Sequence, residues 1–180
     1  MCKRTVPLCA REPSPCVQEN RPLVCPREPS PCVSGGLIGY NSGSATNCSA
    51  SNAVCGGSNV GGFVGWLEVG NIELSSATSV VSGTESIGGF IGRMRRGIVK
   101  NCYAAGDATA TSNYAGGFCG YQRNDASYSH DDSKIINCYS KVKCTAPSNK
   151  GGFCASAYYV GAGDVGTGDV GTCHFCHVCY

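Results

Sequence analysis

The chain has 180 residues, which is enough for one domain with additional segments. Only 14% of the residues are charged, while 26 are Gly and 15 are Cys, a composition far from that of an average enzyme. The formal net charge of +2 is too small to predict binding to nucleic acid or to a membrane surface. Because no run of about 20 apolar residues is present, we expect no transmembrane helix.

The high cysteine content predicts an oxidising compartment, so we expect an extracellular or cell-surface location. No apolar segment typical of a secretory signal peptide follows Met1. These two observations conflict if the chain is complete. We therefore expect the chain to be a fragment of a longer protein.

Residues 1–34 contain two similar octapeptides, CAREPSPC at 9–16 and CPREPSPC at 25–32. Their Pro content disfavours helix and central strand, so we expect a non-globular arm or a cap. Its cysteines can close local loops, link to other chains or bind a metal. Metal binding is the least favoured of the three because no C-x-x-C spacing is present. These cysteines are Cys2, Cys9, Cys16, Cys25 and Cys32.

Residues 35–160 are organised around a Gly-rich pentapeptide that recurs as GGLIG, GGFVG, GGFIG, GGFCG and GGFCA, starting at residues 35, 61, 88, 116 and 151. Each period also contains segments rich in strand-forming residues, separated by Gly, Ser, Asn and Asp. A period near 27 residues without helical patterning predicts one coil of a solenoid per repeat. We therefore expect an all-β fold, a right-handed parallel β-solenoid of about five coils. The Gly pair would allow a positive φ or a close backbone approach.

Stacked coils place equivalent residues in columns. An aromatic residue in four copies predicts a continuous core column. Its members are Phe63, Phe90, Phe118 and Phe153. A second column of stacked side chains predicts a hydrogen-bonded ladder of the kind seen in cross-β structures, formed by Asn47, Asn101 and Asn137.

Two further columns contain cysteine. They consist of Val64, Ile91, Cys119 and Cys154, and of Cys48, Ser76, Cys102 and Cys138. Neighbours in a column should lie about 4.8 Å apart, within the Cα separation of about 4.4–6.8 Å that a disulfide accepts. We therefore predict the disulfides Cys102–Cys138 and Cys119–Cys154. Parallel stacking points both side chains the same way, which would strain these bonds, and buried reduced pairs are the competing state in a cytosolic protein.

The GGF[VI]G core, with Asn-Cys-Tyr segments such as those at 101–103 and 137–139, resembles the GLUG-motif repeats of large bacterial surface and secreted proteins. These include IgA-specific peptidases and haemagglutinin-like adhesins, and the resemblance covers residues 35–160. It implies a stalk or adhesive module. The chain has no HExxH zinc-protease motif, so the resemblance does not imply peptidase activity.

An insertion between residues 121 and 134 lengthens one repeat, and such insertions form loops that often belong to a binding face. It contains His130, Asp131 and Asp132, which could contact a cation, although three adjacent residues rarely form a closed site. No nucleophile elbow and no P-loop is present, so we expect no catalytic residues and no enzyme activity.

Residues 161–180 form a Gly-rich linker followed by a segment rich in Cys and His. The spacing of Cys173, Cys176 and His177 matches c-type haem attachment, with His177 as the axial ligand. The same segment, with His174 and Cys179, could instead bind zinc, or its cysteines could form disulfides or stay as thiols.

The sequence as a whole predicts a structural or adhesive module without a cofactor. We expect a protein or a surface glycan as its partner, or self-association through intermolecular disulfides, and no nucleic acid. The alternative is a redox protein that binds a metal or c-type haem through the C-terminal segment.

Overall fold

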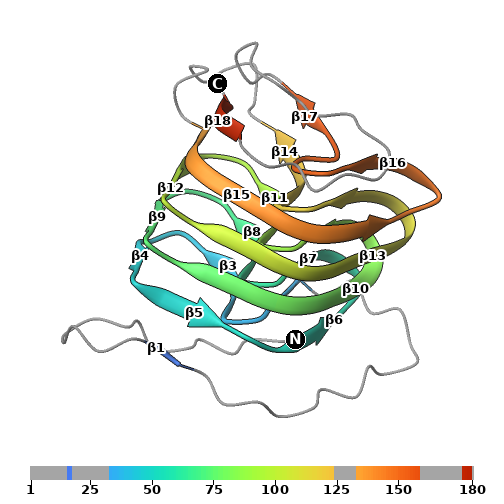
Figure 1. Cartoon of the computed structure of the whole chain (residues 1–180), viewed down its shortest axis with the longest axis horizontal. Helices are drawn as coiled ribbons and strands as arrows, with labels where there is room; N and C mark the ends of the chain where they lie inside the picture. Colours follow the sequence, from blue (N-terminus) through green and yellow to red (C-terminus); the bar gives the residue numbers. More distant parts are fainter. Residues whose placement is uncertain (1–15, 18–32, 124–132, 159–175, 180) are drawn as a thin grey trace.

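The computed structural model describes residues 16–17, 33–123, 133–158 and 176–179, with side chains within 33–123 and 133–156. Its described elements are all β-strands, and the chain winds as a stack of parallel coils (Figure 1). The expected all-β class and the parallel β-solenoid are both confirmed.

One face of the solenoid is a five-stranded sheet in the order β17-β14-β11-β8-β3. Each repeat contributes one short strand to it, at the residues that follow the Gly pair. The strands are β3 (Ile38–Asn41), β8 (Val64–Leu67), β11 (Ile91–Met94), β14 (Cys119–Arg123) and β17 (Ala157–Tyr158).

The other sheet has 13 strands and bends around a corner of the solenoid. Before the corner lie β4 (Ala45–Thr46), β9 (Asn71–Glu73) and β12 (Gly97–Lys100), and after it β5 (Cys48–Ala50), β10 (Ser76–Gly88) and β13 (Tyr103–Gly116). Strand β15 (Ser133–Thr145) spans both sides, because its first residues pair with β12 and its later ones with β13. The remaining strands are β1 (Cys16–Val17), β2 (Ser34–Gly35), β6 (Ala53–Cys55), β7 (Ser58–Gly61), β16 (Ser148–Gly151) and β18 (Cys176–Cys179).

The solenoid has about three turns, slightly fewer than the five coils expected. The first and last repeats form only short strands, such as the two-residue β2 and β17. Strand pairs are parallel throughout the described residues except for β18, which pairs antiparallel with β15. The predicted boundaries of the arm, solenoid and tail, at residues 34 and 160, stay predictions.

The core column of aromatic residues is confirmed. Phe63, Phe90, Phe118 and Phe153 are at most 1% exposed. Their ring centroids lie 4.7, 4.8 and 5.0 Å apart in successive pairs, with interplanar angles of 2°, 11° and 3°. Burial of each ring stabilises the fold by about 1.5–3 kcal/mol, and each stack adds about 0.5–1.5 kcal/mol.

The Gly pair that precedes each Phe allows neighbouring coils to approach closely. A Cβ on Gly88 would lie 1.8 Å from the Ile91 carbonyl oxygen of its own coil and 2.8 Å from the Gly120 amide nitrogen of the next coil. One on Gly89 would lie 2.2 Å from the Gly117 carbonyl oxygen of the next coil. Of the two reasons expected for this pair, close approach is the one that applies, because neither residue has a positive φ.

Candidate functional site

The polar residues that recur between repeats lie at the corner where the 13-stranded sheet bends. One residue at this corner has a left-handed conformation in every coil. These residues are Asn47, Leu74, Asn101 and Asn137, with φ between 51° and 56°. Asn adopts this conformation more readily than most residues other than Gly, which explains why it occupies three of these four positions.

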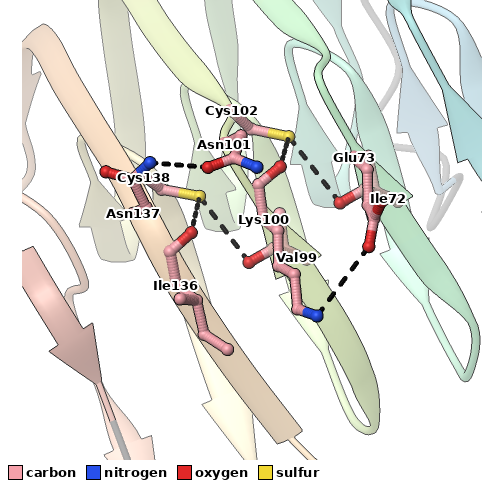
Figure 2. A network of polar contacts seen from close by, with 9 residues as sticks. All are labelled: Ile72, Glu73, Val99, Lys100, Asn101, Cys102, Ile136, Asn137 and Cys138. Carbon is pink, nitrogen blue, oxygen red and sulfur yellow. Dashed lines mark hydrogen bonds and ion pairs between the residues drawn. The ribbon is translucent and has the colours of Figure 1, made fainter.

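The residue after each left-handed position closes the corner with its own side chain, as Figure 2 shows for Cys102 and Cys138. Cys102 Sγ donates to the Lys100 carbonyl at 3.0 Å, and Cys138 Sγ donates to the Ile136 carbonyl at 3.3 Å. Both thiols also lie 3.7 Å from a carbonyl oxygen of the preceding coil, that of Ile72 for Cys102 and that of Val99 for Cys138.

The first two coils have the same arrangement. Cys48 Sγ lies 3.3 Å from the Thr46 carbonyl oxygen, and Ser75 Oγ donates to the Glu73 carbonyl at 2.7 Å. Ser75 Oγ also accepts a hydrogen bond from the Cys48 amide at 3.2 Å. The thiol column is therefore Cys48, Ser75, Cys102 and Cys138, all buried. The alignment that placed Ser76 in this column is wrong by one residue, because Ser76 pairs with Ser49 and Tyr103.

The two upper members of the thiol column interact with each other. Interaction with the Cys138 thiol lowers the pKa of Cys102, and the same interaction, together with burial, raises the pKa of Cys138. Burial also raises the pKa of Cys48. The pair therefore holds its last proton on Cys138, which leaves Cys102 as the more acidic thiol.

The stacking required by both predicted disulfides is present. Cys102 and Cys138 immediately precede the register pair Tyr103 and Tyr139. Cys119 and Cys154 pair directly across parallel strands. All four residues are thiols in this structure. The column with Cys119 and Cys154 is therefore confirmed, and the column with Cys102 and Cys138 is confirmed except at Ser76, while the disulfides stay predictions.

The predicted Asn ladder forms in the upper coils only. Asn137 Nδ2 donates to Asn101 Oδ1 across the stack (Figure 2). Leu74 occupies the corner of the second coil and separates Asn47 from this pair. The reason for these Asn residues, their left-handed backbone, was not inferred from the sequence. The recurrence of Asn directly before Cys was the available signal, because Asn tolerates positive φ.

A second left-handed column lies at another corner and was missed by the sequence reasoning. It consists of Asn59, Ser86, Tyr114 and Asn149, with φ between 48° and 57°. The upper two coils are linked here by a hydrogen bond of 2.6 Å from Asn149 Nδ2 to Asn113 Oδ1. The column could not be recognised from the sequence because the residue type does not repeat: Ser86 and Tyr114 occupy positions that favour Asn.

An aromatic and cationic column runs along the outside of the five-stranded sheet. Register places Tyr40, Trp66, Arg93 and Tyr121 at equivalent positions of successive coils. The rings of Tyr40 and Trp66 are 5.9 Å apart. The Arg93 guanidinium carbon lies 4.7 Å from the Trp66 ring and 5.6 Å from the Tyr121 ring, so both rings hold the cation by cation–π attraction.

Most of the predicted ligand-binding residues lie outside the described part of the chain. These are His130, Asp131 and Asp132 of the insertion, and Cys173 and His174 of the tail. The backbone of Cys176, His177 and Cys179 forms β18, and their side chains are not described. Within the described residues, no three His, Cys, Asp or Glu side chains are grouped to hold a metal ion. The metal and haem assignments stay predictions.

The geometry of the first coil agrees with a comparison to known families. A family model described as the GLUG motif matches residues 30–54, a range that includes the first Gly pair and the corner residue Cys48. The chain carries a GLUG motif. Strand register extends equivalent positions to the later coils, since Ile38 pairs with Val64 and Val64 with Ile91. Comparison with curated proteins and with solved structures finds no match. None of the described residues forms a helix that is long and apolar enough to cross a membrane.

Proposed function

We propose that this chain is a structural or adhesive module of an extracellular or cell-surface protein and acts without catalysis. The GLUG motif and the parallel β-solenoid support a repeat module. In such a stack each coil contacts only its neighbours, so the lateral faces form extended surfaces that can bind a partner along their length.

The observation that carries this proposal is how the recurring polar groups are used. Ser75, Cys102 and Cys138 all donate to main-chain carbonyls of their own corner. Asn137 donates to its stacked neighbour Asn101. These hydrogen bonds close the corners and join neighbouring coils. The recurring polar groups therefore stabilise the fold.

The outer column formed by Tyr40, Trp66, Arg93 and Tyr121 is the contact surface that we assign to the partner. Among the described residues Arg93 forms no ion pair, although its guanidinium is fixed between two rings. An oriented guanidinium without a carboxylate partner favours an acidic group, because it can form two parallel hydrogen bonds with it. An acidic protein segment or an acidic surface glycan has this chemistry.

The test measures binding of the purified chain to intact bacterial and animal cells and to immobilised acidic glycans and proteins. An Arg93→Ala variant should lose at least about tenfold in affinity, since a charge-assisted contact contributes about 1.5–3 kcal/mol. Tyr103→Ala is the matched control, because Tyr103 belongs to a stacked outward pair on a different sheet. Equal binding by the wild type and Arg93→Ala would show that this face is not the contact surface. If the chain binds none of these cells, glycans or proteins, the adhesive function is rejected.

A further inference from the structure

Two strands outside the Gly-rich repeats attach to the solenoid at the thiol column. Strand β1 pairs in parallel with β5, and its register sets Cys16 opposite Cys48. Strand β18 pairs antiparallel with β15, and its register sets Cys176 opposite Cys138. Figure 1 shows β1 beside β5 at one end of the stack and β18 beside β15 toward the other. The column is thus extended by one cysteine at each end.

In both strand pairs, the cysteines lie opposite each other in one register only. A slip of one residue would place Val17 opposite Cys48, or His177 opposite Cys138, instead of a cysteine. Residues directly opposite in neighbouring strands have Cα atoms about 4.5–5.5 Å apart. That separation lies within the window of about 4.4–6.8 Å in which a disulfide forms without backbone movement.

Cys48 has one cysteine neighbour in the column. On its other side lies Ser75, whose hydroxyl accepts a hydrogen bond from the Cys48 amide. A bond along the column from Cys48 can therefore reach only Cys16. Strands β1 and β5 are parallel, so this bond is strained like any bond between parallel strands, but among the described residues of the column no other cysteine competes for Cys48. Another cysteine of this first coil, Cys55 of β6, already takes part in a disulfide bond.

Cys138 has two cysteine neighbours, Cys102 below and Cys176 above, and it can bond to only one of them. A bond to Cys102 joins residues stacked in parallel, whose Cα–Cβ directions coincide, and this geometry strains the disulfide dihedral. Cys176 approaches from an antiparallel strand in a directly opposed pair. Cys102 also has its own hydrogen bond to the Lys100 carbonyl at 3.0 Å, which a disulfide would break. The antiparallel partner is the better one.

We propose that β1 and β18 are covalent end caps, joined to the solenoid by the disulfides Cys16–Cys48 and Cys138–Cys176, while Cys102 stays a thiol. This assignment replaces Cys102–Cys138 as the bond made by Cys138. Each bond forms by thiol–disulfide exchange with an external disulfide such as oxidised glutathione. The two protein thiols lose two electrons and two protons, one S–S bond forms, and the oxidant is reduced to two thiols.

The caps act on the exposed edges of the solenoid. Within the run of strands that carries the thiol column, β5-β10-β13-β15, the two outermost strands are β5 and β15. An unpaired edge strand invites pairing with another chain. Addition of β1 to β5 and of β18 to β15 satisfies these edges with segments of the same chain. A disulfide in register fixes each short strand that hydrogen bonds alone would hold weakly.

The test uses the full chain, refolded in a mixture of oxidised and reduced glutathione, alkylated and digested without reduction. Peptide mapping should recover linked peptides 16–48 and 138–176, with Cys102 alkylated. Recovery of a 102–138 link, or of alkylated Cys138, would overturn the upper cap, and alkylated Cys48 would overturn the lower one.

Two variants connect the bonds to capping. Cys176→Ser should expose the β15 edge, so that the apparent mass in size-exclusion chromatography at least doubles as the protein concentration rises. Cys144→Ser is the matched control, because Cys144 lies on β15 outside the column and should leave the apparent mass unchanged. A Cys176→Ser protein that stays monomeric like the control would show that the tail does not protect this edge.

Discussion

Replacement of Leu74 by Asn should stabilise the solenoid. Leu74 has a φ of 51°, and its side chain is 58% exposed. The left-handed conformation costs a residue other than Gly or Asn about 1–2 kcal/mol. Asn relieves most of this cost, as Asn47 and Asn101 do in the neighbouring coils at φ 56° and 53°. Asn at position 74 would also fill the gap in the corner ladder beside Asn101.

The net gain in the free energy of unfolding should be about 1 kcal/mol. Relief of the backbone cost is offset by about 0.5 kcal/mol, because the half-exposed Leu74 side chain loses some apolar burial. With an m-value of about 2 kcal/mol/M, the urea midpoint should rise by about 0.5 M. The measurement is equilibrium unfolding of the reduced protein, followed by far-ultraviolet circular dichroism.

Two controls separate the backbone effect from a general effect of polar substitution. Leu74→Ala removes the side chain and keeps the unfavourable conformation, so it should not raise the midpoint. Val80→Asn places the same amide on β10, where the residue is 56% exposed and has no positive φ, and it should lower the midpoint. If Leu74→Asn is no more stable than Leu74→Ala, the left-handed corner does not select Asn.

Three further predictions concern packing and titration. Gly89→Ala should lower the free energy of unfolding in urea by at least about 3 kcal/mol, because its Cβ would lie 2.2 Å from the Gly117 carbonyl oxygen. Gly43→Ala is the control: its Cβ would meet nothing within 4 Å, so it should be neutral or stabilising. Equal effects of the two substitutions would contradict the close approach of the coils. Phe90→Ala should cost about 3–5 kcal/mol, since Phe90 is fully buried and stacked on both sides, and a loss below about 2 kcal/mol in the same assay would argue against a continuous core. Burial raises the pKa of Cys144 from 9.0 to about 11, so the contribution of this thiol to the stability of the reduced protein should be fully present below pH 9 and lost as the pH rises through 11. The total loss in the free energy of unfolding should be about 2–3 kcal/mol. If Cys144→Ser loses stability with pH as steeply as the wild type, the loss does not come from Cys144.

The parts of the fold that could be predicted from the sequence are those in which the residue type repeats with the coil. The Gly pair and the Phe that follows it recur in four copies, and steric approach and aromatic stacking demand the same residue in each coil. The number of coils was overestimated because a repeat at the end of a stack has a neighbour on one side only. There the motif is present and the strands are short, as in β2 and β17.

The parts that could not be predicted are those in which a conformation repeats while the residue does not. Leu74 and Tyr114 have the same left-handed backbone as the Asn residues above or below them, and no residue pattern connects them. The one-residue error at Ser76 has the same origin. Without Asn before it, Ser75 could not be recognised as the corner residue, although it makes the same contact to the carbonyl two residues earlier as Cys102 does.

Ser75 also shows what the corner requires of its side chain. Its hydroxyl donates to the Glu73 carbonyl at 2.7 Å, while the thiols of Cys48, Cys102 and Cys138 make the corresponding contact at 3.0–3.3 Å. A hydroxyl is the stronger donor, so closure of the corner does not account for sulfur at these positions. Disulfides to the end strands account for Cys48 and Cys138, the two members of the column that lie opposite another cysteine across β1 and β18. Serine at position 48 or 138 should therefore keep the corner and lose the cap, which separates the two roles of this column.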